Sequence, residues 1–254
     1  MAAIDIDGTL VDHEGELPQT NIDAVHRVIA AGVPVVLATG RGWHSTRPIF
    51  EALQLPPGPA VCANGAAQVT FPPFEVLSVV RFNPEQVIRR VHELAPQAIL
   101  AVEDVGTGYR TTREFPPGEL VGEVSIETID DLCSREVTRL VIRDPNSSVE
   151  EFDELATALG MQGVGYFIGW SAWIDIAPAG VSKASGLADV CRHLGVDQAD
   201  VLAIGNGRND IEMFEWAGRG VAMGDSVSQV KAAADYVTAP FDQFGLAQEL
   251  DLWF

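Results

Sequence analysis

Short, almost entirely apolar runs separated by helix-length segments constrain this chain more than any other feature. One such run is VPVVLA at 33–38, and a second is AVCA at 60–63, with a helical pattern at 45–54 between them. A strand covered on one side alternates apolar and polar residues, whereas a strand covered on both sides is apolar throughout. This order of strand, helix and strand predicts a parallel sheet with helices on both faces.

The same order returns near the end of the chain. A helix is expected at 183–194 with Gly195 as its stop, followed by the buried strands VLAI at 201–204 and GVAM at 220–223. In the first part of the chain, a helix is expected to begin with Thr20 as its N-cap, answered by Asp23. The two ends of the chain therefore predict one parallel domain built from two segments.

The middle of the chain follows a different pattern. Two helices, one after Asn83–Pro84 and one at 149–159, are each associated with strands that form hairpins. Such units predict an antiparallel sheet with helices on one face. The expected fold is a doubly wound, Rossmann-like α/β core with an inserted α+β domain, divided as 1–80 (core, first part), 81–179 (inserted domain) and 180–254 (core, second part).

The charge limits the partners of the protein. The 254 residues carry a formal net charge of −20, which repels nucleic acids and anionic membranes. The three cysteines are distant from one another and lie in apolar contexts, as expected of buried thiols in a reducing compartment. With neither a signal peptide nor a run long enough to cross a membrane, the chain is expected to be cytoplasmic. Its oligomeric state is left open.

Two aspartates follow the first apolar run. Asp5 and Asp7 stand one residue apart at its end, and Gly8 allows a sharp turn directly after them. In a doubly wound sheet ligands bind beyond the carboxyl ends of the strands, where both carboxylates are expected. Two close carboxylates share their protons unequally, so one can act as a nucleophile while the other carries a proton.

Three further motifs follow DIDGTLV at 5–11 in a fixed order: ATGR at 38–41, SK at 182–183 and GNGRND at 205–210. With these four motifs the chain resembles the haloacid dehalogenase (HAD) superfamily phosphatases, of the Cof-like branch with a large inserted C2-type cap. The resemblance covers the whole parallel domain. It implies a HAD core with a cap domain, and a phosphoric monoester hydrolase that uses Mg²⁺.

The resemblance also implies the catalytic roles. Asp5 would attack the substrate phosphorus and become an aspartyl-phosphate, while Asp7 would protonate the leaving oxygen and later deprotonate water. Thr39 and the backbone at Gly40 would hold a phosphoryl oxygen, and Lys183 would pair with Asp5 and the phosphoryl group. These roles agree with the chemistry, because phosphoryl transfer depends on positioning and on neutralising charge.

Metal and substrate contacts follow from the same resemblance. Mg²⁺ would be held by Asp5, by the backbone carbonyl of Asp7, and by Asn206 and Asp210. The family usually has Asp where this chain has Asn206, whose amide oxygen can bind Mg²⁺ but adds no charge. A lower metal affinity, or a larger share for Asp210, is therefore expected. The predicted contacts to phosphate or substrate are Thr39, Gly40, Arg41, Asn64, Lys183 and Asn209.

The sequence thus predicts a Mg²⁺-dependent phosphatase for a small phosphorylated metabolite. A sugar phosphate is the expected substrate only because that class is common in the family. A narrow phosphatase for sucrose phosphate or mannosyl-phosphoglycerate is an alternative, since such enzymes share this cap position. The other alternative is a weak or silent homologue that binds ligands as a regulatory protein, which Asn206 favours. A dehalogenase is disfavoured by the second aspartate, and a mutase by the place of the insertion.

Overall fold

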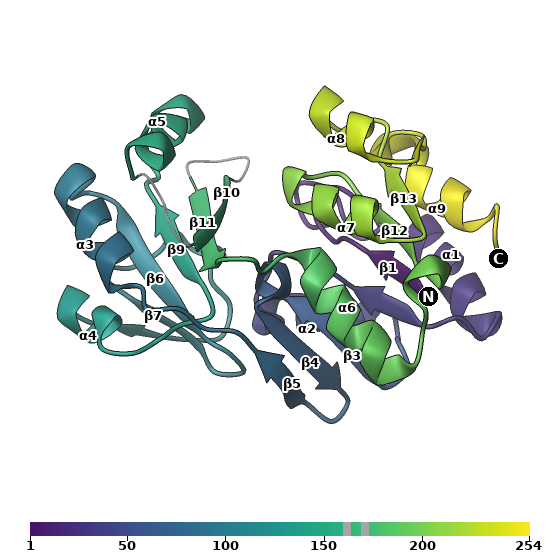
Figure 1. Ribbon diagram of the computed structural model, residues 1–254, viewed down its shortest axis with the longest axis horizontal. Coiled ribbons are helices and arrows are strands. Elements are labelled where there is room, and N and C mark those ends of the chain that lie inside the picture. Colours follow the sequence, from purple (N-terminus) through teal and green to yellow (C-terminus); the bar gives the residue numbers. More distant parts are fainter. Residues whose placement is uncertain (160–163, 169–172) are drawn as a thin grey trace. The chain divides into compact units, whose positions relative to one another are not determined.

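The computed structural model of the chain describes residues 1–159, 164–168 and 173–254 (Figure 1). The chain forms two compact units. The first contains Met1–Arg41, Thr46–Ser78 and Ser182–Phe254, and the second contains Gly42–Ser45 and Val79–Val181. The first unit contains a parallel sheet and a smaller three-stranded sheet, and the second unit contains a six-stranded sheet.

A parallel sheet forms the centre of the first unit. Its strands are β1 (Ala2–Ile4), β2 (Val35–Leu37), β12 (Leu202–Gly205), β13 (Arg219–Ala222) and β14 (Tyr236–Val237). They lie in the order β14-β13-β12-β1-β2, and every neighbouring pair is parallel. The first strand therefore lies between β12 and β2, although β12 follows it by about two hundred residues. This confirms the expected parallel sheet built from both ends of the chain.

Helices bury this sheet. Ala3, Val36 and Ala203 belong to a core cluster that also contains side chains from three helices: α6 (Lys183–Leu194), α7 (Ile211–Trp216) and α8 (Ser228–Ala233). Neighbouring strand residues point to the opposite face, and Ile4 and Ile204 are also fully buried there. The remaining helices of this unit are α1 (Gln19–Ala30), α9 (Gly245–Leu250), which packs against α1, and α2 (Trp43–Ala52), which continues from the second unit.

The third expected strand departs from the parallel arrangement. β3 (Gly58–Cys62) pairs antiparallel with β4 (Ala67–Phe71), which is followed by β5 (Glu75–Val79) in a separate three-stranded sheet. It meets the end of β2 only through an isolated parallel bridge between Ala38 and Val61. The cause is the turn Ala63–Gly65, whose residues have φ values of 50°, 52° and 96° and reverse the chain into β4. The Asn64–Gly65 pair thus lies in a hairpin turn, as its sequence suggests.

The start of the first helix also differs from the expectation. α1 begins at Gln19, with Pro18 before it in an extended conformation and no side-chain cap. Thr20 is therefore not the N-cap. Asp23 instead accepts a hydrogen bond from the Gln19 side chain at 2.8 Å, so the proposed capping pair is replaced by an interaction within the helix. Proline has a fixed φ and no backbone N–H. It therefore suits the start of a helix, where an N–H group would have no partner within the helix.

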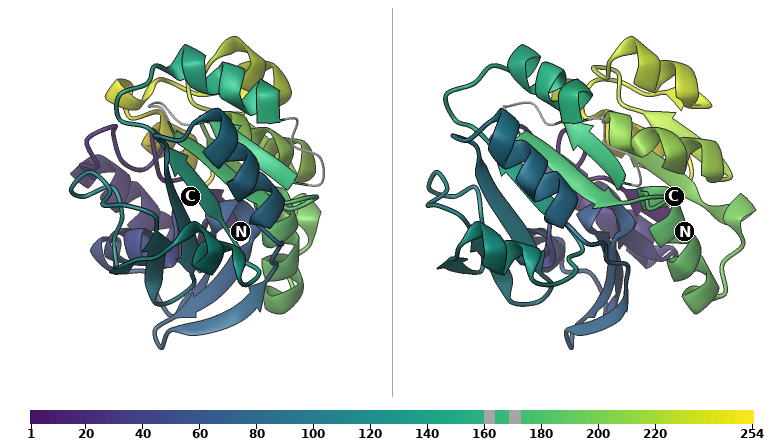
Figure 2. Two further views of the ribbon diagram at one scale, coloured as in Figure 1. Left: turned by 90° about the vertical axis from the view of Figure 1, so that its left-hand side faces the viewer. Right: turned by 60° about the vertical axis from the view of Figure 1, so that its left-hand side comes forward.

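The second unit contains a mixed sheet with helices on one face. Its described strands are β6 (Ile99–Asp104), β7 (Gly108–Thr111), β8 (Glu123–Ile126), β9 (Leu140–Arg143), β10 (Val164–Ile168) and β11 (Trp173–Pro178). They lie in the order β10-β11-β9-β6-β7-β8, antiparallel except for β7 and β8. One face is buried by α3 (Glu85–Leu94), α4 (Ile129–Cys133) and α5 (Val149–Leu159), as Figures 1 and 2 show. The expected α+β insertion is confirmed as a fold.

Cys62 and Cys191 are free and buried, whereas Cys133 is free but only partly buried. Among the helices of the described residues, none is both long enough and apolar enough to span a membrane.

Candidate active site

Lys183 lies at the centre of the candidate site. Its Nζ donates hydrogen bonds to Asp5 Oδ1 at 2.5 Å and to Asp210 Oδ1 at 2.6 Å, and its side chain is completely buried. The lysine is the first residue of α6, which Ser182 caps by accepting from the Ser185 backbone N–H. The helix start therefore fixes the backbone of Lys183, and two carboxylates fix its amine.

Burial sets the protonation of this group of charges. Removal from water, followed by the charge of Asp210, raises the pKa of Asp5 to about 7 even though Lys183 opposes the shift. Burial disfavours the charged amine, but the carboxylates of Asp210 and Asp5 outweigh it and raise the pKa of Lys183. Lys183 is thus held in its charged form beside a buried aspartate whose pKa is raised. A cation bound at Asp5 would favour the ionised form of that carboxyl.

The loop after β1 holds both predicted catalytic aspartates. The Asp5 N–H donates to the Ile204 carbonyl of β12 at 2.9 Å, so this residue still follows the sheet. Thr9 donates from Oγ1 to Asp5 Oδ2 at 3.3 Å. The chain then turns at Gly8, which has a φ of 76° and donates from its N–H to the Val11 carbonyl. Asp5 is consequently buried at the end of the strand.

Asp7 lies in a more open environment than Asp5. Its side chain is 49% exposed, and both carboxylate oxygens accept hydrogen bonds from Arg41, Oδ2 from Nε at 2.9 Å and Oδ1 from Nη2 at 2.5 Å. The sequence suggested Arg41 as a contact to phosphate and gave no sign of this pairing. The two residues are 34 positions apart, so only the tertiary structure brings them together.

The loop after β2 places Thr39 beside the first strand. The Thr39 side chain is fully buried, and its N–H donates to the Val61 carbonyl at 2.9 Å. The preceding residue, Ala38, donates to the Ile4 carbonyl of β1. The Thr39 hydroxyl accepts from the Arg41 N–H at 3.0 Å. The carboxyl ends of β1 and β2 therefore carry Asp5 and Thr39 at the same edge of the sheet.

Two predicted asparagine contacts meet at this edge. Asn209 donates from Nδ2 to Asn64 Oδ1 at 2.9 Å. The Asn64 side chain also lies against Gly40, where an added Cβ would be 3.1 Å from Asn64 Oδ1. Asn64 is buried and has a φ of 52°, a conformation that asparagine adopts more readily than most residues. Asn64, Asn209 and Gly40 therefore form one contact group.

The 205–210 loop folds around the Asp210 carboxylate. Asp210 Oδ2 accepts from the backbone N–H groups of Asn206 at 2.8 Å and Gly207 at 2.7 Å. The Asn206 side chain lies directly over Gly8, where an added Cβ would be 2.0 Å from Asn206 Nδ2. The ten residues predicted for the site thus belong to the loops at this sheet edge, to the turn after β3 and to the start of α6.

The donor atoms of this region suit a magnesium ion. Asp5 and Asp210 offer carboxylate oxygens, Asn206 an amide oxygen and Asp7 a backbone carbonyl, and such hard oxygen donors are the ligands of Mg²⁺. Both oxygens of Asp210 accept hydrogen bonds, Oδ1 from Lys183 and Oδ2 from two N–H groups. Within the described part of the chain, Asp5 Oδ2 accepts only the long bond from Thr9. Asp5 is therefore the carboxylate with most capacity for a direct metal bond.

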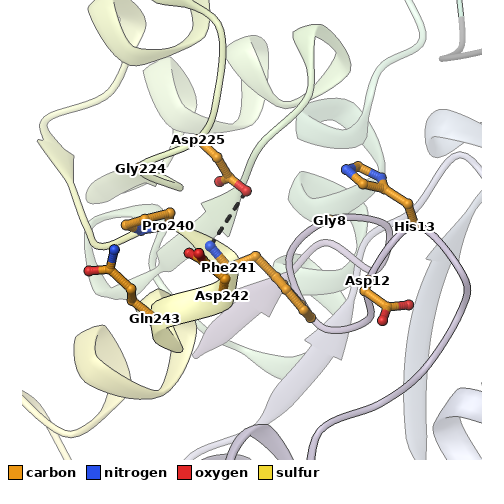
Figure 3. Close-up of a pocket in the computed structure, with 9 residues that line it drawn as sticks. All are labelled: Gly8, Asp12, His13, Gly224, Asp225, Pro240, Phe241, Asp242 and Gln243. Carbon is orange, nitrogen blue, oxygen red and sulfur yellow. Dashed lines mark hydrogen bonds between the residues drawn. The ribbon is translucent and has the colours of Figure 1, made fainter.

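A pocket of about 550 Å³ opens beside the same first loop (Figure 3). It is lined by Gly8, Asp12, His13, Gly224, Asp225 and Pro240–Gln243, and in it the Phe241 N–H donates to Asp225 Oδ2 at 3.5 Å. Of the predicted motif residues only Gly8 contributes to its wall, and the aspartates with predicted catalytic roles do not line it. The pocket is therefore distinct from the candidate reaction site.

The chain is similar to known proteins over almost its whole length. The family model for haloacid dehalogenase-like hydrolases matches residues 2–250. The putative phosphatase YkrA of Bacillus subtilis is 31% identical, over 96% of this chain and 93% of its own length. The pyridoxal phosphate phosphatase YbhA of Escherichia coli is 28% identical, over 97% and 95%.

A solved structure supports the fold. The HAD subclass IIB sugar phosphatase BT4131 superposes with a TM-score of 0.82 and 24% identity, covering 99% of this chain and 98% of its own. Together with the match over nearly the whole chain, this confirms the predicted family and its capped α/β fold. This chain belongs to the haloacid dehalogenase-like hydrolase family, among relatives that are named as phosphatases.

Proposed function

We propose that this chain is a Mg²⁺-dependent phosphomonoester hydrolase that passes a phosphoryl group first to Asp5 and then to water. The observation that carries the proposal is the buried group of Asp5, Lys183 and Asp210 at the carboxyl edge of the parallel sheet. A buried lysine between two carboxylates holds a fixed positive charge where an incoming phosphate would need one.

The proposed reaction has two steps. An Asp5 carboxylate oxygen forms a bond to phosphorus as the bond from phosphorus to the leaving oxygen breaks, and Asp7 gives its proton to that oxygen. In the second step Asp7 takes a proton from water, the water oxygen bonds to phosphorus, and the bond from Asp5 to phosphorus breaks. Asp5 is regenerated as a carboxylate and Asp7 as an acid, so the cycle closes.

Other residues of the chain would neutralise and orient the phosphoryl group. Lys183 would pair with its oxygens, and the Thr39 hydroxyl and Gly40 backbone would hold another oxygen. Asn64 and Asn209, which are hydrogen-bonded to each other beside Gly40, would contact the substrate. Mg²⁺, held by Asp5, the Asp7 carbonyl, Asn206 and Asp210, would supply further positive charge at the phosphoryl oxygens.

The second unit, by this proposal, is the cap that selects the leaving group. Its sheet face away from the helices carries a connected polar group, in which Arg139 donates to Asp175 Oδ1 at 2.7 Å and to the Tyr109 hydroxyl at 3.1 Å. We propose residues 81–179 as this cap, and 1–80 with 180–254 as the catalytic core. The proposed substrate is a small phosphorylated metabolite, with sugar phosphate preferred because that class is common in the family. The enzyme is proposed to be cytoplasmic.

The test is hydrolysis of p-nitrophenyl phosphate with and without Mg²⁺. The wild-type protein is expected to release nitrophenol only with the metal, and Asp5→Asn, which keeps the side-chain volume but removes the nucleophile, is expected to show only background release. A panel of phosphorylated metabolites, ranked by kcat/KM, would then identify the substrate class.

Two outcomes would contradict the proposal. Equal turnover by the wild type and Asp5→Asn would exclude Asp5 as the nucleophile. No turnover of any panel member would instead favour the second candidate, a silent homologue that binds ligands, for which the neutral Asn206 in the predicted metal loop is the supporting observation.

A further inference from the structure

The Arg41 side chain engages Asp7 in a two-pronged hydrogen bond. Nε reaches Oδ2 at 2.9 Å and Nη2 reaches Oδ1 at 2.5 Å, so the planar guanidinium contacts both oxygens of one carboxylate. A fork of this kind fixes the orientation of a carboxylate as well as its position, which a lysine amine does not do. The pair is partly open to solvent, with 25% of the Arg41 side chain and 49% of the Asp7 side chain exposed.

The backbone that carries Arg41 is held at three points. Its N–H donates to the Thr39 hydroxyl at 3.0 Å, and its carbonyl accepts from the Ala63 N–H at 2.9 Å. The Thr39 carbonyl accepts from the Asn64 N–H at 3.0 Å. The guanidinium therefore extends from a loop that is fastened to the turn after β3, and this loop sets where the Asp7 carboxylate lies.

The two aspartates of the first motif are held in different ways. Asp5 is buried and bound by Lys183 and Thr9, whereas Asp7 is half exposed and bound through both oxygens by Arg41. A half-exposed carboxylate without such a partner would sample several rotamers. Proton transfer requires hydrogen-bond reach to the reacting oxygen, and a misplacement of about 1 Å can cost about 100-fold in rate.

We propose that Arg41 is a positioning residue, which orients the Asp7 carboxylate for proton transfer to the leaving oxygen. The inference rests on the proposed function and assigns Arg41 an action through Asp7. The guanidinium contacts leave further lone pairs on each carboxylate oxygen, so a proton can still be exchanged at Asp7. In the transfer step that proton moves to the leaving oxygen as its bond to phosphorus breaks and the Asp5 bond to phosphorus forms.

Leaving-group dependence separates this role from phosphate binding. Phenyl phosphate and p-nitrophenyl phosphate differ by one nitro group, but phenolate is the poorer leaving group and depends more on protonation. The parameter to compare is kcat/KM, which includes only the steps up to transfer of the phosphoryl group to Asp5. The ratio of kcat/KM for p-nitrophenyl phosphate to that for phenyl phosphate then reports how well the acid is placed.

The variants to measure are Arg41→Met and Arg41→Lys. Arg41→Met is expected to raise this ratio about tenfold, because phenyl phosphate loses the acid while p-nitrophenyl phosphate hardly needs it. Arg41→Lys keeps the charge without the fork and is expected to restore only part of the discrimination. In an Asp7→Asn background, Arg41→Met is expected to leave the ratio unchanged, because the group through which it acts is already absent.

Arg27→Met is the matched control. Arg27 donates from Nε and Nη2 to Asp251 Oδ1 at 2.8 and 2.6 Å, so this variant also removes an arginine paired with an aspartate, but on the exposed surface of α1. It is expected to leave the ratio at the wild-type value. The same comparison shows whether loss of one positive charge from this acidic protein is sufficient to change kcat/KM.

The possible results point in different directions. An increased ratio in Arg41→Met that disappears in the Asp7→Asn background supports the inference. An equal loss for both substrates, or an effect of Arg41→Met that persists fully in the Asp7→Asn background, would overturn the positioning role and leave phosphatase activity in place. Lack of turnover by the wild type would overturn the proposed function and the role of Arg41 with it.

Discussion

Lys183 places one positive charge between two buried carboxylates, an arrangement that is costly unless each partner is present. Removing one member of a buried ion pair typically costs about 3–5 kcal/mol, because the remaining charge stays buried without compensation. Asp210 offsets part of this cost by accepting two backbone N–H bonds. Asp5 has fewer such bonds, and burial together with the charge of Asp210 raises the pKa of its carboxyl. At the residue scale, Asp5, the proposed nucleophile, is the member of the group expected to gain most from a further cation.

A substitution of Asn206 tests directly whether a metal cation binds beside Asp5. Its neutral side chain lies over Gly8, and Asn206→Asp would add a fourth carboxylate to the region of Asp5, Asp7 and Asp210. Without metal, the added charge is expected to lower the melting temperature, since like charges repel in a partly buried site. With Mg²⁺, it is expected to raise the affinity, because carboxylate is the stronger ligand. Calorimetric titration with Mg²⁺ measures the affinity, and thermal unfolding with and without the ion measures the stability.

The control for this prediction is Asn146→Asp, which adds the same charge in a loop of the second unit. It is expected to leave the Mg²⁺ titration unchanged. Equal titrations of the wild type and Asn206→Asp would remove Asn206 from the metal site.

Single residues differed in how well their surroundings could be predicted. The order of four motifs was sufficient to select Asp5, Lys183 and Asp210, and the structure brings these three into direct contact. The partner of Arg41 could not be selected in that way, because an arginine after a glycine is compatible with many acceptors. Its pairing with Asp7 depends on how two loops from neighbouring strands fold toward each other, which no local pattern records.

At the scale of elements, glycines allow the site loops to approach one another. The turn after β3 brings Gly65 so close to the start of α6 that an added Cβ would be 2.0 Å from the Ser182 carbonyl oxygen. Gly186, in the first turns of the same helix, would place a Cβ 2.6 Å from Val61 Cγ1. The helix that carries Lys183 is therefore packed closely against β3 and the turn after it at these two glycines, and side chains there would force it away.

Gly65→Ala is expected to displace α6 and to impair both stability and catalysis. Its φ of 96° adds a backbone penalty of about 1–2 kcal/mol for an L-residue, and the contact with Ser182 must also be relieved. Because Lys183 follows Ser182, the displacement would weaken its bonds to Asp5 and Asp210. The measurements are urea unfolding and kcat/KM for p-nitrophenyl phosphate.

Gly195→Ala separates strain from displacement. Gly195 ends the same helix with a φ of 68°, and a Cβ there would meet nothing within 4 Å. This variant is expected to lose stability by the backbone penalty alone and to keep its kcat/KM. If the two variants lost activity equally, close packing of the turn against α6 would not be what positions Lys183.

Elements were more predictable where a stop signal accompanied the periodic pattern. The helix expected at 183–194 is α6 with the same bounds, because Ser182 caps its start and Gly195 its end. The first helix lacked such a cap, and its cap position, Pro18, lies two residues before the expected Thr20. β3 was misplaced because its apolar run fits either kind of sheet, and the three positive φ values of the following turn decide in favour of the antiparallel partner.

For the whole molecule, the net charge of −20 conflicts with the proposed anionic substrate. A buried lysine that is already paired does little to change the field at a distance, since its neighbouring carboxylates cancel its charge. The long-range field is therefore expected to repel a phosphate ester, while the short-range contacts of the site attract it. Salt weakens the long-range repulsion more than the short-range attraction, because dissolved ions screen charges that are far apart.

The expected consequence is that added salt speeds capture of the substrate. Raising KCl from about 0.01 M to about 0.15 M shortens the screening length from about 30 Å to about 8 Å, which weakens repulsion during approach. kcat/KM for p-nitrophenyl phosphate is therefore expected to rise severalfold, with kcat nearly constant because the bound complex is screened little. Steady-state kinetics at saturating Mg²⁺ measures both parameters, and potassium acetate in place of chloride controls for competition by the anion. A fall in kcat/KM with either salt would mean that cations near the site dominate the field, against the sign of the total charge.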